Sequence, residues 1–97
     1  MKIVREALAG TLESSDLMVR IAPKDGGLDI VLESEVIHQF GAQIEAVVRE
    51  TLDRLGIDEG LVVVEDKGAL DCVVRARIQT AVSRAVDEWT ADWRALA

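Results

Sequence analysis

Two adjacent serines, Ser14 and Ser15, offer hydroxyl groups next to the carboxylate of Asp16. A serine hydroxyl can be the point at which another group is attached covalently. The stretch Gly10–Asp16 lies between two strand-like runs, and Ser and Asp favour turns because their side chains bond to nearby backbone groups. The pattern alone therefore indicates an ordinary hairpin turn, with an attachment site as the functional alternative.

Few other side chains have a pattern that points to chemistry. His38 falls opposite the apolar stripe of its predicted helix, which indicates a surface histidine without the partners that a catalytic base needs. Cys72 is the only cysteine, so there is no zinc or dithiol signature. Glu65, Asp66 and Asp71 lack the spacing of a calcium loop and are expected to form a turn and a helix N-terminus. We do not expect an independent enzyme.

Composition sets the class of protein and its excluded partners. The chain has 97 residues, 49% of them hydrophobic, which fits one domain with a modest core. The net charge is −7 and no cluster of Lys or Arg offsets it, so neither nucleic acid nor a membrane surface is an expected partner. A lone cysteine, no signal-peptide pattern and no run long enough to span a bilayer predict a soluble cytoplasmic protein.

The first third of the chain reads as three strands. Ile3–Leu12 and Leu17–Ile21 flank the serine-containing turn and predict a first hairpin. Pro23–Gly27 is a strong turn signal, because Pro fixes φ and the Asp-Gly-Gly sequence supplies positive φ. In Leu28–Glu33 apolar residues alternate with polar ones, which predicts a strand with one wet face.

An amphipathic helix is expected from about residue 35 to 55. Its apolar stripe consists of Val36, Ile37, Phe40, Ile44, Val47, Val48, Thr51, Leu52 and Leu55. Ser34 is the expected N-cap, with Glu35 in the first turn, and Gly56 has the position of the C′ residue.

The second half adds a strand and a helix. Leu61–Glu65 is rich in β-branched residues and predicts a strand buried on both faces, or nearly so. A second helical stripe follows: Leu70, Val73, Val74, Ile78, Ala81, Val82 and Ala85. The expected fold is α+β, with a small mixed β-sheet of about four strands and two helices packed on one face, in the order β-β-β-α-β-α. The helix between the third and fourth strands can serve as the crossover of a parallel pair.

The C-terminal residues continue the second stripe. Trp89, Trp93 and Leu96 fall at helical spacing, so we expect the last helix to run nearly to the C-terminus, with residues 87–97 as a helical tail of the single domain 1–97. The two tryptophans either pack back on the core or dock on a partner. The pattern leaves both interpretations open.

Three separated parts of the chain form a further pattern: Ala9–Asp16 with Met18–Ile21, then Gln39–Gly41, and then Asp66–Cys72 with Arg75–Arg77. In this order they closely resemble the acyl carrier protein of citrate lyase, its gamma subunit. The similarity runs from the N-terminus to about residue 84 and leaves only the tail outside it. Several blocks that match in order are a far more specific signal than any one of them.

The resemblance implies a carrier whose serine is linked by a phosphodiester to 2′-(5″-phosphoribosyl)-3′-dephospho-CoA, an arm that ends in a thiol. In the family the modified serine follows Gly-Thr-Leu-Glu, which corresponds to Ser14. Ser15 ranks second, because the family also accepts glycine there. Glu13 and Asp16 would cap the turn or help to position the prosthetic-group transferase. The protein itself would supply attachment, orientation and partner contacts.

The resemblance also implies partners and a role without catalysis. The alpha subunit of citrate lyase would exchange acetyl for citrate on the arm, and the beta subunit would cleave the citryl thioester to oxaloacetate and the acetyl carrier. Two alternatives stay open. One is the carrier subunit of a malonate decarboxylase-type complex, and the other is a non-covalent interaction module that uses the open sheet face and the tail.

Overall fold

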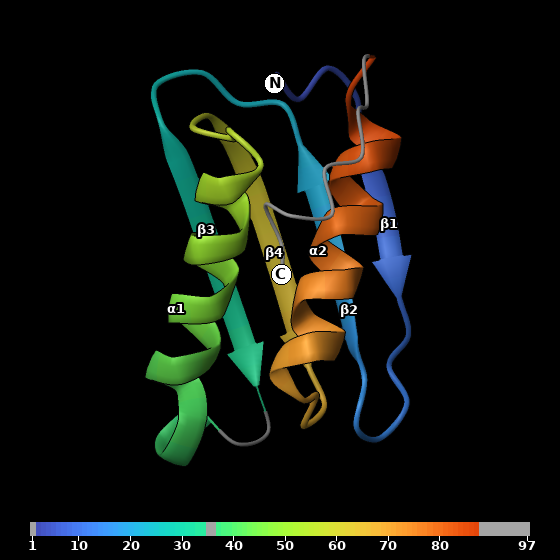
Figure 1. Cartoon of the computed structure of the whole chain (residues 1–97), viewed down its shortest axis with the longest axis vertical. Coiled ribbons are helices and arrows are strands. Elements are labelled where there is room, and N and C mark those ends of the chain that lie inside the picture. Colours follow the sequence, from blue (N-terminus) through green and yellow to red (C-terminus); the bar gives the residue numbers. More distant parts are fainter. Residues whose placement is uncertain (1, 35–36, 88–97) are drawn as a thin grey trace.

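Four strands form one mixed sheet, and two helices pack against it, in the computed structural model of the chain (Figure 1). The structure describes residues 2–34 and 37–87, and of residues 37–40 only the backbone. The elements are β1 (Ala7–Gly10), β2 (Leu17–Ala22), β3 (Leu28–Ser34), α1 (Ile37–Arg54), β4 (Gly60–Asp66) and α2 (Asp71–Ala85). The predicted α+β class and element order are confirmed.

The strands lie side by side in the order β1-β2-β4-β3. β1 pairs antiparallel with β2 and β2 with β4, whereas β3 and β4 are parallel. A parallel pair needs a crossover, and α1 supplies it, as the sequence predicted. The register sets Val64 of β4 between Val19 of β2 and Leu32 of β3. β4 is therefore held by a ladder on each side.

Both helices cover the same face of the sheet and leave the other face open (Figure 1). Leu17, Val19 and Ile21 of β2 and Val62 and Val64 of β4 are fully or almost fully buried, and they form the sheet side of the core. The residues that alternate with Val62 and Val64 are Leu61, Val63 and Glu65. They are half-buried, because they lie on the open face. The strand predicted to be buried on both faces, or nearly so, is therefore fully buried on one face and half-buried on the other.

The structure confirms the predicted residue at the C-terminal end of α1 and describes only part of the N-terminal end. Gly56 follows the helix with a φ of +72°, and its amide donates to the carbonyl of Asp53 at 3.0 Å, as expected of a C′ glycine. Ser34, the expected N-cap, is the last residue of β3, and residues 35 and 36, which join it to α1, lie outside the described residues, so its capping role stays a prediction. Its hydroxyl donates to the carboxylate of Asp66 at 2.8 Å, so it links the ends of two parallel strands.

Helix α2 buries most of the stripe that the sequence predicted. Its buried residues are Val74, Ile78, Ala81, Val82 and Ala85. Leu70 is an exception: it precedes the first helical residue as the N-cap, and it is 70% exposed. The helix ends at Ala85 and Val86 is extended, so the expected unbroken helix toward the C-terminus is wrong at this point. Trp89 and Trp93 lie outside the described residues.

The segment before β1 does not lengthen that strand. It forms hydrogen bonds with the C-terminal end of α2 instead. The amides of Val4 and Arg5 donate to the carbonyl of Ala85 at 2.9 and 3.3 Å, and the Arg5 guanidinium pairs with Asp87. The predicted first hairpin is confirmed, but its first strand has only 4 residues.

Candidate functional site

Ser14 and Ser15 lie at the tip of the loop that joins β1 to β2, and both are exposed. The amide of Asp16 donates to the carbonyl of Glu13 at 3.2 Å, so Glu13–Asp16 is a hydrogen-bonded turn with the serines at its two central positions. Ser15 has a φ of +65°, and it is the only non-glycine residue with positive φ in the described part of the chain. Positive φ at the third position alone is the mark of a type II turn, where glycine is preferred.

The backbone of this turn is fixed to the segment that follows β4. The amide of Ser15 donates to the carbonyl of Lys67 at 2.8 Å, and the amide of Lys67 donates to the carbonyl of Asp16 at 2.9 Å. These bonds continue the β2–β4 ladder beyond its last pair, Leu17 with Asp66. The turn is therefore an extension of the sheet, and Ser15 and Asp16 are held by main-chain bonds to Lys67.

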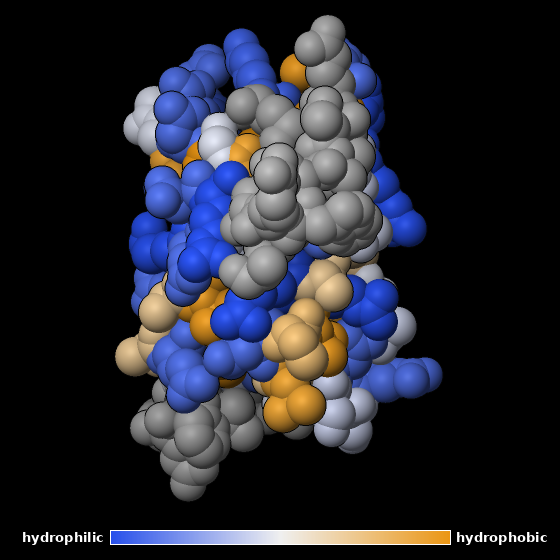
Figure 2. Space-filling view, viewed as in Figure 1, coloured by the Kyte–Doolittle hydropathy of each residue, from blue (hydrophilic) through white to orange (hydrophobic). Residues whose placement is uncertain are grey.

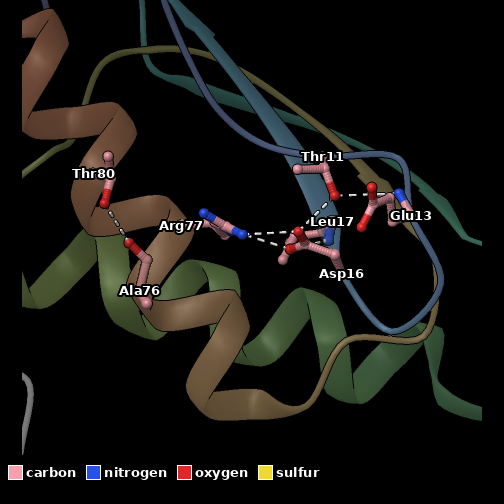
Figure 3. Close-up of polar contacts among 7 residues, drawn as sticks. All are labelled: Thr11, Glu13, Asp16, Leu17, Ala76, Arg77 and Thr80. Atoms are coloured by element: carbon pink, nitrogen blue, oxygen red, sulfur yellow. Dashed lines mark hydrogen bonds and ion pairs between the residues drawn. The ribbon is translucent and has the colours of Figure 1, made fainter.

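The Asp16 carboxylate is the centre of the side-chain contacts around the turn (Figure 3). It accepts hydrogen bonds from the Thr11 hydroxyl at 2.7 Å and from the amide of Leu17 at 2.7 Å. The Arg77 guanidinium of α2 binds both carboxylate oxygens, Nε to Oδ1 at 3.1 Å and Nη2 to Oδ2 at 2.8 Å. Asp16 thus caps its own turn, the first of the two roles expected for it, and ties the turn to α2.

The electrostatics of this pair favour its ionised form. The hydrogen bond from the Arg77 guanidinium, followed by that from the Thr11 hydroxyl, lowers the pKa of Asp16 from 3.8 to about 2. The same contact raises the pKa of Arg77. The Asp16 side chain is 14% exposed and that of Arg77 is 37% exposed, so the pair lies at the edge of solvent. Such bidentate, charge-assisted hydrogen bonds fix the relative orientation of the two side chains as well as their distance.

Gly10 makes room for this arrangement at the end of β1. Its φ is +99°, and a Cβ placed on it would lie 1.9 Å from the carbonyl oxygen of Leu17 and 3.3 Å from Cδ of Arg77. A side chain at this position would therefore collide with the backbone of β2 and press on the arginine. Gly10 and Thr11 thus have different structural roles. Gly10 lets the backbones of β1 and β2 come close together, and Thr11 donates a hydrogen bond from its hydroxyl to Asp16.

A second carboxylate, that of Asp66, holds the segment between β4 and α2. It is 1% exposed, and it accepts from the amides of Gly68 and Ala69 at 3.1 and 3.0 Å as well as from Ser34. Its role is the turn that the sequence predicted for these acidic residues. Among the side chains that the structure describes, those of residues 2–34 and 41–87, no three of His, Cys, Asp or Glu gather in a group that could hold a metal ion.

The remaining residues considered from sequence do not join the turn. Cys72 is an exposed free cysteine near the start of α2, and the side chains of His38 and Phe40 lie outside the described residues. Neither described helix is long and apolar enough to cross a membrane. The partner that sequence reasoning missed is Arg77, which is 61 positions from Asp16. It belongs to one of the matching blocks, but nothing in its spacing links it to the turn.

A family model and several known proteins are similar to this chain over most of its length. A family model described as malonate decarboxylase delta subunit (MdcD) matches residues 4–85. A citrate lyase acyl carrier protein of Rhodopseudomonas palustris is 75% identical over 96 residues, which cover 99% of each chain. Another, from an Enterobacter species, is 69% identical and the match covers 96% of each chain.

The fold has a relative among solved structures. A chain in the crystal structure of a Pseudomonas malonate decarboxylase hetero-tetramer in complex with malonate superposes with a TM-score of 0.76. The match covers 89% of each chain at 23% sequence identity. At this identity the likeness concerns the fold alone.

Proposed function

The chain belongs to the citrate lyase acyl carrier protein family, and from this premise we propose that it carries acyl groups on a prosthetic arm attached to Ser14. The observation that supports this most is the exposed Ser14 at the tip of a turn whose backbone is fixed to the segment after β4. The carrier subunit contributes attachment and orientation, and the reactive group belongs to the arm.

The turn fits a phosphodiester at Ser14. Among the described residues, the Ser14 hydroxyl has no hydrogen-bond partner, so its modification breaks no contact of the fold. The bonds that hold the turn come from Ser15, Lys67 and Asp16 instead. The negative charge of the phosphodiester would not be buried here, because Ser14 is exposed. Ser15 is the weaker candidate, since its amide is bonded and its φ is that of a position suited to glycine.

Attachment needs an activated donor and a transferase. The Ser14 oxygen would form a bond to the phosphorus of an activated phosphoribosyl dephospho-CoA, the bond to a leaving diphosphate would break, and the hydroxyl proton would pass to a base or to solvent. The 2′-(5″-phosphoribosyl)-3′-dephospho-CoA arm then supplies a terminal thiol that holds acetyl and citryl groups as thioesters while citrate is cleaved to acetate and oxaloacetate. The Asp16–Arg77 pair keeps the base of the arm at a fixed place on the sheet.

The partners of the proposed carrier are the alpha (acyl transferase) and beta (citryl lyase) subunits of citrate lyase, together with the prosthetic-group transferase. A carrier role in malonate decarboxylation is the second candidate, favoured by the description of the matching family model. The high identity to citrate lyase carriers over nearly the whole chain favours citrate.

Reconstitution tests the function and separates these candidates. The arm-bearing protein, acetylated on its thiol, is mixed with citrate lyase alpha and beta subunits and citrate, and in parallel with malonate decarboxylase subunits and malonate. We expect oxaloacetate from citrate, no turnover of malonate and no product with Ser14→Ala. Turnover of malonate alone would support the second candidate. Assembly and activity of a chain that never gains the mass of an arm would contradict both.

A further inference from the structure

Two exposed leucines flank the end of the molecule that carries Ser14. The large hydrophobic residues that are exposed in the described part of the chain are Val4, Leu8, Leu12, Val31 and Leu70. Leu12 is 52% exposed in the β1–β2 loop, and Leu70 is 70% exposed between β4 and α2. Two backbone hydrogen bonds through Lys67 join these loops to each other. Leu12 and Leu70 therefore belong to one anchored unit together with the serine turn.

Leu70 is an unfavourable choice for the local structure. It is the N-cap of α2, with extended φ and ψ, and it gives the helix no side-chain cap. Ser, Thr, Asp and Asn are preferred at this position and leucine is among the least favoured, because an orphan amide of the first turn needs an acceptor. A residue that is poor for its helix and contributes a mostly exposed side chain points to a requirement outside the fold.

The surroundings of Leu70 extend the apolar surface and give it a charged border. Figure 2 shows hydrophobic side chains gathered at the lower end of α2, on the face that the helices form. Exposed Cys72 and half-buried Val73 belong to this end of the helix. Acidic side chains adjoin the two leucines in the sequence, Glu13 after Leu12 and Asp71 after Leu70. Lys67 and Arg77 are basic residues of the same end, but the charge of Arg77 is paired with Asp16, and the whole chain carries a charge of −7. A partner surface that complements this end is apolar at its centre and basic around it.

We propose that Leu12 and Leu70 are the docking contacts for the transferase that attaches the arm, a protein with an apolar depression and basic side chains at the mouth of its active site. This inference rests on the proposed function of Ser14. The transferase must bring its active site to the Ser14 oxygen itself, so its footprint has to include the residues around the turn. The subunits that act at the far end of a long arm do not have this constraint. Exposed apolar side chains beside a reacting group are the anchors that such an interface uses.

Kinetics of arm attachment test the proposal. Initial rates of mass gain are measured with the cognate transferase and activated donor for the wild type, Leu12→Ser, Leu70→Ser and Leu8→Ser. Leu8 is the matched control, because it is 47% exposed but lies in β1 on the open face of the sheet. We expect a KM for the carrier that is about tenfold higher for Leu12→Ser and Leu70→Ser, with kcat nearly unchanged. Leu8→Ser should have the KM of the wild type.

A stability measurement separates docking from folding. Leu70→Ser supplies a helix cap, so its Tm should rise by a few degrees while its KM becomes worse. A structural role for Leu70 would instead lower the Tm. Unchanged KM values for Leu12→Ser and Leu70→Ser would overturn the proposal, as would an equal rise for Leu8→Ser or an effect confined to turnover by the citrate lyase subunits. A wild type that gains no mass would overturn the proposed function itself, and the docking inference with it.

Discussion

Replacement of Asp16 by Asn tests how strongly the turn is fixed to α2. The substitution keeps the size of the side chain and removes the charge that binds the Arg77 guanidinium at 2.8 and 3.1 Å. The pKa of Asp16 falls from 3.8 to about 2, and at about 1.4 kcal/mol per pKa unit the ionised carboxylate stabilises the fold by about 2.5 kcal/mol at most. Because Arg77 is 37% exposed, solvent screening lowers the expected loss to about 1 to 2 kcal/mol.

The stabilisation that Asp16 gives to the fold changes with pH in one direction, which follows from its lowered pKa. The pKa of Asp16 is lower in the folded chain than in the unfolded chain, so its stabilisation is complete above pH 4 to 5 and is lost as the pH falls toward 2. The Asn variant lacks this contribution at every pH. The difference in unfolding free energy between the two proteins should therefore be greatest at neutral pH and shrink between about pH 4 and 2.

Urea unfolding of both proteins from pH 7 down to pH 2.5 measures this difference. Arg77→Gln and the double variant complete a thermodynamic cycle, which isolates the energy of the pair from the effects of each substitution. Hydrogen exchange of the Ser15 amide, which is bonded to Lys67, should be faster in Asp16→Asn. The interpretation of the pair as an anchor is refuted by equal stabilities at pH 7, or by a coupling energy near zero.

Three further substitutions test other contacts of the site. Ser15→Gly should preserve or raise stability, by up to about 1 kcal/mol in urea unfolding, because it relieves a positive φ that costs a non-glycine residue energy; a clear loss would contradict the turn geometry. Gly10→Ala should destabilise by more than about 2 kcal/mol in the same assay, since its Cβ would meet the Leu17 carbonyl at 1.9 Å; a neutral result would contradict that approach. Asp66→Ala should lower the unfolding free energy by about 2 to 4 kcal/mol, because it leaves two backbone amides without their acceptor, and thermal unfolding unchanged from the wild type would show that those bonds contribute little.

The sequence predicted the elements better than the contacts between their ends. The alternation in Leu28–Glu33 located a strand, and the two apolar stripes located the helices. Each of these elements packs one face against the core, and this gives its sequence the period of a strand or of a helix. Leu70 was assigned to the apolar stripe of the second helix by its spacing alone. It precedes the first helical residue, so helical spacing does not tell which way its side chain points. Ser34 has the residue type of an N-cap, and its hydroxyl also donates to Asp66 on the neighbouring strand. Periodicity carries no information on such a long-range hydrogen bond.

The candidate site shows the same division. Local turn chemistry located Ser14 and Ser15, because Ser and Asp favour turns by bonding to the nearby backbone. The anchor of the turn was not predictable in this way, since Asp16 and Arg77 meet only after the sheet and α2 are assembled. The choice of Ser14 over Ser15 came from resemblance to a family. The positive φ of Ser15 adds a physical reason for that order.

The attachment of the arm to Ser14 is tested most directly by locating it on the peptide chain. The wild type, Ser14→Ala and Ser15→Ala are each co-expressed with the transferase and the enzymes that make its donor, and intact masses are followed by fragmentation of the peptide that contains the turn. We expect the mass of the arm on the wild type and on Ser15→Ala, localised to Ser14, and no gain on Ser14→Ala. An arm found on Ser14→Ala, or localised to Ser15 in the wild type, would contradict the assignment.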